Sequence, residues 1–310
     1  MKKFSKICLI IVAVLGGMGL LLGGISALLG GGFGAIRRMA ERGELDAGNW
    51  HIRPYELYYS SDEDTEDDWG ADDDAKVYTY EAAGIKNLDI DIDAAEIYVK
   101  QGTDDKNLVV RTYGCKEKYY KGDINKDTLQ IQYEIHKQFP DNYDAQIVIE
   151  IPEKMTFDTM DFDIGAADAD FASGSVNCRT MELNVGAGEL TGADFAVTGT
   201  LDIKLGAGDI DLEGGTYKDI KLDCGMGSFA LDGIVAENVK AHCGMGDGSI
   251  TLRGREEDYN YKMSCGMGDL TVNGESYSDL SGSYKVTNAG AVGTIDLDCG
   301  MGSIDFDIES

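Results

Sequence analysis

A short motif recurs through the second half of the chain, and it constrains the fold more than any other feature. Each copy alternates apolar and polar residues and ends on Gly-x-Gly or a close variant. The first glycines of the copies are Gly165, Gly186, Gly206, Gly225, Gly244, Gly266 and Gly300, with a degenerate earlier copy at Asp93. The intervals between these glycines are nearly equal, except for a longer one between Gly266 and Gly300. A period of this kind indicates a repeat architecture.

The alternation predicts which way each strand faces. The residues one, three and five positions before each glycine are apolar or small, and those between them are mostly polar. The residues directly before the glycine (or Asp93) are Ile92, Ile164, Val185, Leu205, Cys224, Cys243, Cys265 and Cys299. Such a pattern is typical of a short strand with one buried face. A second alternation follows each corner, as in 209–212 and 228–231.

Two short strands in each repeat of about 20 residues fit one coil of a parallel β-solenoid. Each coil would pair with the next at about 4.8 Å, so that equivalent residues form ladders. Four earlier alternating stretches, 88–99, 108–114, 128–135 and 145–151, also predict strands. We therefore expect an all-β fold, with irregular first coils and a cap over 76–155 and regular coils over 156–310. The handedness of the coil stays open.

Two places depart from the repeat. Asp247-Gly248 adds a glycine after the corner, which we interpret as a bulge or a longer corner. The long interval before Gly300 indicates either an insertion or a degenerate extra coil around 275–293, and the sequence does not choose between them.

The N-terminal segment predicts a membrane anchor. Residues 7–29 carry no charge and are long enough to cross a hydrocarbon core of about 30 Å. A cleaved signal peptide is the alternative, but its apolar core would be shorter and followed by a small-residue cleavage site. We expect one transmembrane helix after a cytoplasmic tail of residues 1–6. The C-terminal domain would then lie outside the cell.

Between the anchor and the repeats, residues 30–75 are expected to form a juxtamembrane segment and an acidic tether. The stretch 62–74 is rich in carboxylates and contains no basic residue. Such a run repels itself and cannot bury a core. The whole chain has a net charge of −29, which argues against nucleic acid as a partner.

The motif Cys-Gly-Met-Gly occurs four times, at 224–227, 243–246, 265–268 and 299–302. Structural zinc sites use close cysteine pairs, whereas each of these cysteines lies in a separate copy of the repeat. Earlier copies place Ile, Val or Leu at the same position. We therefore predict four buried, reduced thiols in the core and no metal site. A disulfide between stacked neighbours stays an alternative, because adjacent strands bring Cα atoms within its range.

The methionines of the motif are Met226, Met245, Met267 and Met301, where earlier copies have Ala166, Ala187 and Ala207. They should stack at the corner. The sequence does not tell whether they fill the core or face solvent. A copper(I) site is conceivable because thioether sulfur is a soft ligand, but stacked packing is the expectation.

The remaining candidates for chemistry are carboxylates and histidines. One set of carboxylates follows the glycines and another precedes them: Asp168, Glu189, Asp209, Asp247 and Asp269, and Asp163, Asp223 and Asp298. They match no calcium motif, so only weak, diffuse Ca²⁺ binding is expected. His51, His136 and His242 are interpreted as surface residues. We predict no catalytic residue, no cofactor site and no metal site.

The segments 151–171 and 201–214 resemble the bacterial β-strand-repeat family known as "putative adhesin", a domain of unknown function. The resemblance covers about residues 76–310 and implies a membrane-anchored β-solenoid on the bacterial surface. We expect a non-enzymatic adhesion or envelope interaction module with a protein or glycan ligand. Alternatives are an envelope-stress sensor that acts with a membrane partner and a carbohydrate-active enzyme.

Overall fold

The computed structural model describes residues 50–53, 56–59, 75–135, 145–277 and 283–309. The chain divides into two compact units, Met1–Asp68 and Trp69–Ser310. In the first unit, β1 (Trp50–Arg53) and β2 (Glu56–Tyr59) form an antiparallel pair. The predicted anchor at 7–29 and the acidic stretch at 62–74 lie outside the described residues. In the described part of the chain, no helix is both long and apolar enough to cross a membrane.

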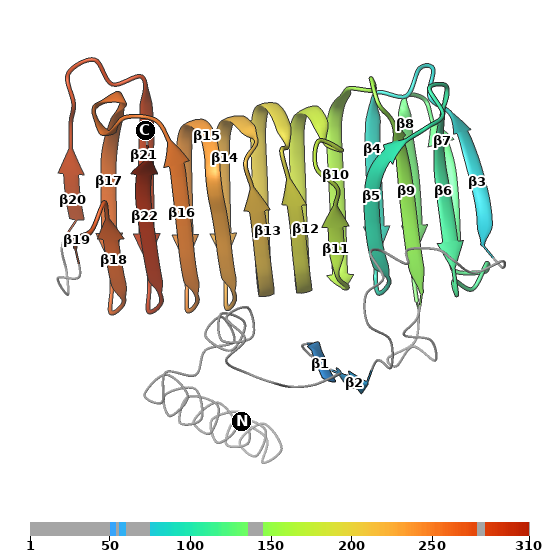
Figure 1. The fold of residues 1–310 in the computed structure, drawn as a ribbon, viewed down its shortest axis with the longest axis horizontal. Helices are drawn as coiled ribbons and strands as arrows, with labels where there is room; N and C mark the ends of the chain where they lie inside the picture. The colour runs from blue at the N-terminus through green and yellow to red at the C-terminus, as the bar shows by residue number, and fades with distance from the viewer. Residues whose placement is uncertain (1–49, 54–55, 60–74, 136–144, 278–282, 310) are drawn as a thin grey trace, which may run out of the picture. The chain divides into compact units, whose positions relative to one another are not determined.

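The second unit confirms the all-β prediction (Figure 1). Its strands are β3 (Lys76–Glu81), β4 (Asn87–Ile92), β5 (Glu96–Gly102), β6 (Asn107–Tyr113), β7 (Tyr120–Asn125), β8 (Thr128–Tyr133), β9 (Gln146–Pro152), β10 (Phe157–Ala166), β11 (Ala169–Phe171), β12 (Asn177–Ala193), β13 (Ala196–Glu213), β14 (Thr216–Cys224), β15 (Ser228–Cys243), β16 (Asp247–Arg253), β17 (Tyr259–Cys265), β18 (Asp269–Val272), β19 (Glu275–Ser276), β20 (Ser283–Val286), β21 (Gly293–Cys299) and β22 (Ser303–Glu309). A single 3₁₀ turn, Glu256–Asp258, is the one helical element assigned among the described residues.

Successive repeats pair in parallel and in register. β10 pairs with β12, β12 with β13 and β13 with β14, so that Ile164, Val185, Leu205 and Cys224 form one ladder. The strands after the corner form a second ladder, in which Ile210 lies beside Phe229. The repeats therefore build a β-solenoid-like stack, and the strands of neighbouring coils lie side by side in Figure 1.

The core is the space between the two strand ladders. All the apolar positions predicted to face inward are buried, including Ile90, Phe162, Leu183 and Leu297. Aromatic rings fill this space: Phe171 packs edge-on against Phe162 of its own coil at 5.0 Å and against Phe195, which follows β12, at 5.5 Å, measured between ring centroids. Inward alternation thus supplies a continuous core along the stack.

The order of coils in space differs from their order in the chain at both ends. β4 and β5 pair with β10 and β11 on one side and with β8 and β9 on the other, although β8 and β9 follow them in sequence. At the other end, β21 and β22 lie between β15–β16 and β17–β18. The last coil of the chain is therefore an interior coil of the stack.

This order explains the long interval between Gly266 and Gly300. The segment after β18 adds two short antiparallel strands, β19 against β18 and β20 against β17, before the chain returns to form β21. The extra residues are an insertion and not a further coil. Antiparallel strands also close the opposite end, where β7 pairs with β8 and β6 with β9.

The interpretation of Asp247-Gly248 as a bulge or a longer corner is wrong. Asp247 is in register with Ser228 and Ser303, and Gly248 with Phe229 and Ile304. Gly248 occupies an inward position, and a Cβ atom there would lie 2.1 Å from Cζ of Phe229. The missing side chain makes room for a large ring in the next coil, so the glycine serves packing and not a corner.

Candidate functional site

The four Cys-Gly-Met-Gly corners lie on four consecutive coils. Their spatial order is Cys224, Cys243, Cys299 and Cys265, each in register with the next. The amide of each methionine donates to the first glycine carbonyl of the neighbouring corner: Met245 to Gly225 at 2.9 Å and Met301 to Gly244 at 2.8 Å are examples. Residues that are distant in sequence are thereby brought to one edge of the stack.

Both glycines of the motif are required by the close approach of neighbouring corners. A Cβ atom on Gly244 would lie 2.7 Å from the carbonyl oxygen of Gly225, and one on Gly246 would lie 1.7 Å from that of Gly227. Both contacts are with backbone, which has little room to move. The backbone of one corner therefore lies directly on that of the next.

The cysteine side chains form hydrogen bonds on the inner side of the corners. Each thiol donates to the carbonyl oxygen of the second glycine in its own motif, at 3.4 Å from Cys224, 3.1 Å from Cys243 and 3.0 Å from both Cys265 and Cys299. Ile164, Val185 and Leu205 offer no such donor. The strands β12 and β13 run through their Gly-Ala-Gly corners, whereas the Cys-Gly-Met-Gly corners separate one strand from the next. The corner after Ile164 also separates two strands, β10 and β11, so a thiol is one way and not the only way to form such a corner.

The prediction that these four cysteines are buried in the core is confirmed, and all are free. Burial raises the pKa of Cys299 to about 12. Cys224 and Cys243 lie side by side and titrate as a pair: their interaction raises the pKa of Cys224, to which burial also contributes, and lowers the pKa of Cys243. In the described part of the chain, no three His, Cys, Asp or Glu side chains converge as metal ligands.

The methionines lie on the outside of the same corners. Their exposed fractions are 58% for Met226, 48% for Met245, 54% for Met301 and 71% for Met267. Ala187 and Ala207 occupy the equivalent positions in the preceding coils. The methionines therefore contribute little to the core, and they form a row of exposed thioethers above a row of buried thiols.

The carboxylates after the corner form a ladder in which serine interrupts the acids. Its order in space is Asp168, Glu189, Asp209, Ser228, Asp247, Ser303 and Asp269. Ser228 donates to Asp209, and Ser303 donates to Asp247 at 2.6 Å. Hydroxyl groups between carboxylates reduce the repulsion that stacked like charges would cause. The alternation of serine and acid from Asp209 to Asp269 depends on the spatial order of the coils, because Ser303 lies between Asp247 and Asp269 only in space.

The acids before the corner are separated from one another. Asp223 lies between Lys204 and His242, and Asp298 lies between His242 and Ser264. Asp163 is in register with Asp91, whose pKa is raised by burial first and then by Asp163. The three acids singled out in the sequence thus do not meet at one point.

Of the three histidines, His242 has its contacts described. It is half-buried, and its Nδ1 lies 3.1 Å from Oδ2 of Asp298 in the neighbouring coil. His136 lies outside the described residues, and His51 belongs to β1. The interpretation of His242 as a surface residue is confirmed.

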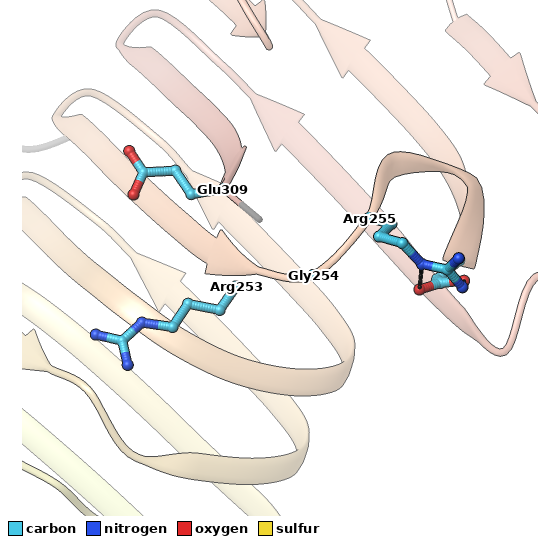
Figure 2. A pocket seen from close by; sticks show the side chains of 5 residues that line it. Arg253, Gly254, Arg255 and Glu309 are labelled. Carbon is cyan, nitrogen blue, oxygen red and sulfur yellow. Dashed lines mark hydrogen bonds and ion pairs between the residues drawn. The ribbon is translucent and has the colours of Figure 1, made fainter.

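A shallow hollow of about 450 Å³ lies beside the end of β16 and is lined by Arg253, Gly254, Arg255, Asp258 and Glu309. Figure 2 shows Arg255 on one side of Gly254 and Arg253 and Glu309 on the other. Arg255 donates from Nε and Nη2 to the Asp258 carboxylate at 3.0 and 2.6 Å. No pattern in the sequence indicated this hollow, because Glu309 reaches it only through the interior position of the last coil.

The stacked coils and their repeated corners define an all-β protein of the repeat class. Residues 85–297 match the Toastrack DUF4097 family, and the chain belongs to that family. A comparison with curated proteins found no match.

Several solved structures are similar to this chain at low identity. A "putative adhesin" from Bacteroides fragilis is 16% identical, with a TM-score of 0.45, over 76% of this chain and 98% of that chain. A "putative cell adhesion protein" from Clostridium sporogenes is 13% identical, with a TM-score of 0.38, over 76% and 99%. A "putative lipid binding protein" from Parabacteroides distasonis is 13% identical, with a TM-score of 0.34, over 76% and 97%.

Proposed function

We propose that this chain is a non-enzymatic, membrane-anchored surface protein whose stacked coils act as an adhesion or envelope interaction module. The observation that carries the proposal is the in-register repetition of outward side chains along the stack. On the strands before the corner, one outward ladder runs Asp202, Lys221, Lys240, Asp296, Lys262. A face that presents a charged group at every coil suits an extended or repetitive ligand.

The charges on this ladder are paired in a way that keeps the face open to a partner. Lys262 binds Asp296 at 3.0 Å, and Lys221 lies 3.9 Å from Asp202. Exposed pairs of this kind contribute only about 0–1 kcal/mol each, so an approaching ligand can replace them at small cost. A protein or glycan carrying both hydrogen-bonding groups and dispersed charge would match such a face.

The cellular placement is part of the proposal. The uncharged segment 7–29 supports a single membrane span, with the C-terminal domain outside the cell. Protease treatment of intact cells tests this placement. Cleavage within residues 76–310, with a cytoplasmic control protein intact, is the expected result. Survival of the domain while surface controls are cut would place it inside and exclude adhesion.

Ligand binding is tested with the full chain in detergent micelles on glycan and envelope-protein arrays. Saturable binding without turnover is expected, and a variant with K221E, K240E and K262E should lose it. Unchanged binding by that variant would exclude this face. Association with a second membrane protein, lost when the span 7–29 is exchanged for another, would favour the alternative function of an envelope-stress sensor. Turnover of a bound glycan would favour a carbohydrate-active enzyme.

A further inference from the structure

We propose that the row of exposed methionines, Met226, Met245, Met301 and Met267, is a binding site for a soft monovalent metal ion, Cu(I) or Ag(I). The row is defined by backbone geometry. The amides of the four methionines donate to carbonyls of Gly206, Gly225, Gly244 and Gly300 at 2.8–2.9 Å. The four side chains therefore start from equivalent points on four consecutive coils.

The spacing of the row suits two-coordinate binding. Neighbouring strands are about 4.8 Å apart, so thioethers on adjacent coils start from points at that separation. Two metal–sulfur bonds of about 2.3 Å, the length seen for zinc and thiolate, place two sulfurs about 4.6 Å apart across one ion. Each adjacent pair in the row can hold an ion with little movement, because the methionine side chain has three rotatable bonds.

The chemistry of the donors selects the metal. Thioether sulfur is a neutral, soft ligand that favours Cu(I) over hard ions such as Ca²⁺ and Mg²⁺. A chain with a net charge of −29 also raises the local concentration of cations. Each ion brings one positive charge to a neutral set of ligands, and the acidic surroundings offset that charge.

Packing does not account for the row. Ala187 and Ala207 fill the same corner position in adjacent coils, so the corner has no need of a long apolar side chain. All four methionines are exposed, and the lowest exposed fraction is the 48% of Met245. Exposed apolar groups repeated at one position on four consecutive coils point to a ligand. The sequence left open whether these methionines are buried or exposed, and stacked packing was the expectation. Their exposure is the reason why we infer a binding site instead.

The buried thiols below the row are a separate set of ligands, and a test must distinguish them. They are 0–6% exposed and donate to glycine carbonyls inside the corner. Quadruple substitution of Cys224, Cys243, Cys265 and Cys299 to Val removes the thiols and keeps an apolar core residue, as Val185 does in its coil. Quadruple substitution of the four methionines to Leu removes the thioethers and keeps the exposed apolar surface.

The experiment titrates Ag(I), which needs no reductant, and then Cu(I) without oxygen, into the full chain labelled with ¹³C at the methionine methyl groups. The methyl signals of Met226, Met245, Met301 and Met267 should shift at stoichiometric metal. Those of the buried Met160, Met181 and Met263 are internal controls and should stay in place. Single Met→Leu substitutions assign the signals.

Binding measured by metal analysis after dialysis should be retained in the Cys→Val variant and lost in the Met→Leu variant. The proposal is overturned if the exposed methyl signals do not shift or if the Met→Leu variant binds as much metal as the wild type. Loss of all binding in a folded Cys→Val variant would also overturn it. The methyl signals of the wild type decide the matter if either variant fails to fold.

Discussion

Cys243 pairs in register with Cys299, although Cys265 lies between them in the chain. The interior position of the last coil follows from this pairing. If the last coil of the chain lay at the end of the stack, its removal would break one interface between coils. Removal of this interior coil breaks two. The stack is thus completed only when the C-terminal strands enter it.

The first prediction tests the order of the coils. Along one outward ladder, Asp296 lies between Lys240 and Lys262. The pair K240C and D296C should be joined by a thiol-specific cross-linker that spans about 5 Å, the distance between neighbouring strands. The pair K240C and K262C should not, because those positions are two strands apart. Mass spectrometry of the digested protein identifies the linked peptides, and the reverse result would show coils in chain order.

The second prediction concerns the corner glycines. The substitution G246A should lower the free energy of unfolding by about 3 kcal/mol or more, because the new Cβ would lie 1.7 Å from the Gly227 carbonyl oxygen. M245A in the same corner is the matched control. It changes an exposed side chain and should stay within about 0.5 kcal/mol of the wild type. Urea unfolding measures both, and equal losses in the two variants would contradict this account of the corner.

The third prediction concerns size matching between coils. Gly248 and Phe229 are in register, and the ring of Phe229 fills the space that a side chain at 248 would occupy. G248A alone should cost about 1–3 kcal/mol through overpacking. In combination with F229L the cost of G248A should fall, giving a coupling energy above about 0.5 kcal/mol. Additive losses in this double-mutant cycle would mean that the ring does not depend on the glycine.

The buried face of each strand could be predicted because one pattern recurs in every coil. Val185, Leu205 and Cys224 differ in chemistry, but each precedes a corner glycine, and all three are buried. The core character of the cysteines followed from this equivalence. Their hydrogen bonds to the glycine carbonyls did not, because those bonds depend on the path of the corner.

The order of the coils could not be predicted, because neighbouring copies carry interchangeable inward residues. Cys265 would satisfy the ladder beside Cys243 as well as Cys299 does, so the pattern allows either arrangement. The one signal was the long spacing before Gly300, which fits several connections. The exposure of Met245 was equally open, since alanine and methionine both occur at that corner. Gly248 was misinterpreted because its role depends on a residue in another coil.

The fourth prediction concerns alkaline pH. Burial raises the pKa of Cys178 from its usual 9.0 to about 12. Below pH 9 both the folded and the unfolded chain hold this proton, so the residue contributes its full stability there. Between pH 9 and 12 the unfolded chain releases the proton while the folded chain retains it, and the free energy of unfolding falls.

The substitution C178V isolates that effect, since Val197 already occupies the same ladder in the next coil. The stability of C178V should fall less steeply than that of the wild type from pH 9 to 12. Below pH 9 the difference between the two proteins should be constant. Urea unfolding at intervals of pH measures both curves, and the comparison cancels the tyrosines and other groups that titrate in the same range. Parallel curves up to pH 12 would show that the Cys178 thiol ionises as readily in the folded chain as in the unfolded one.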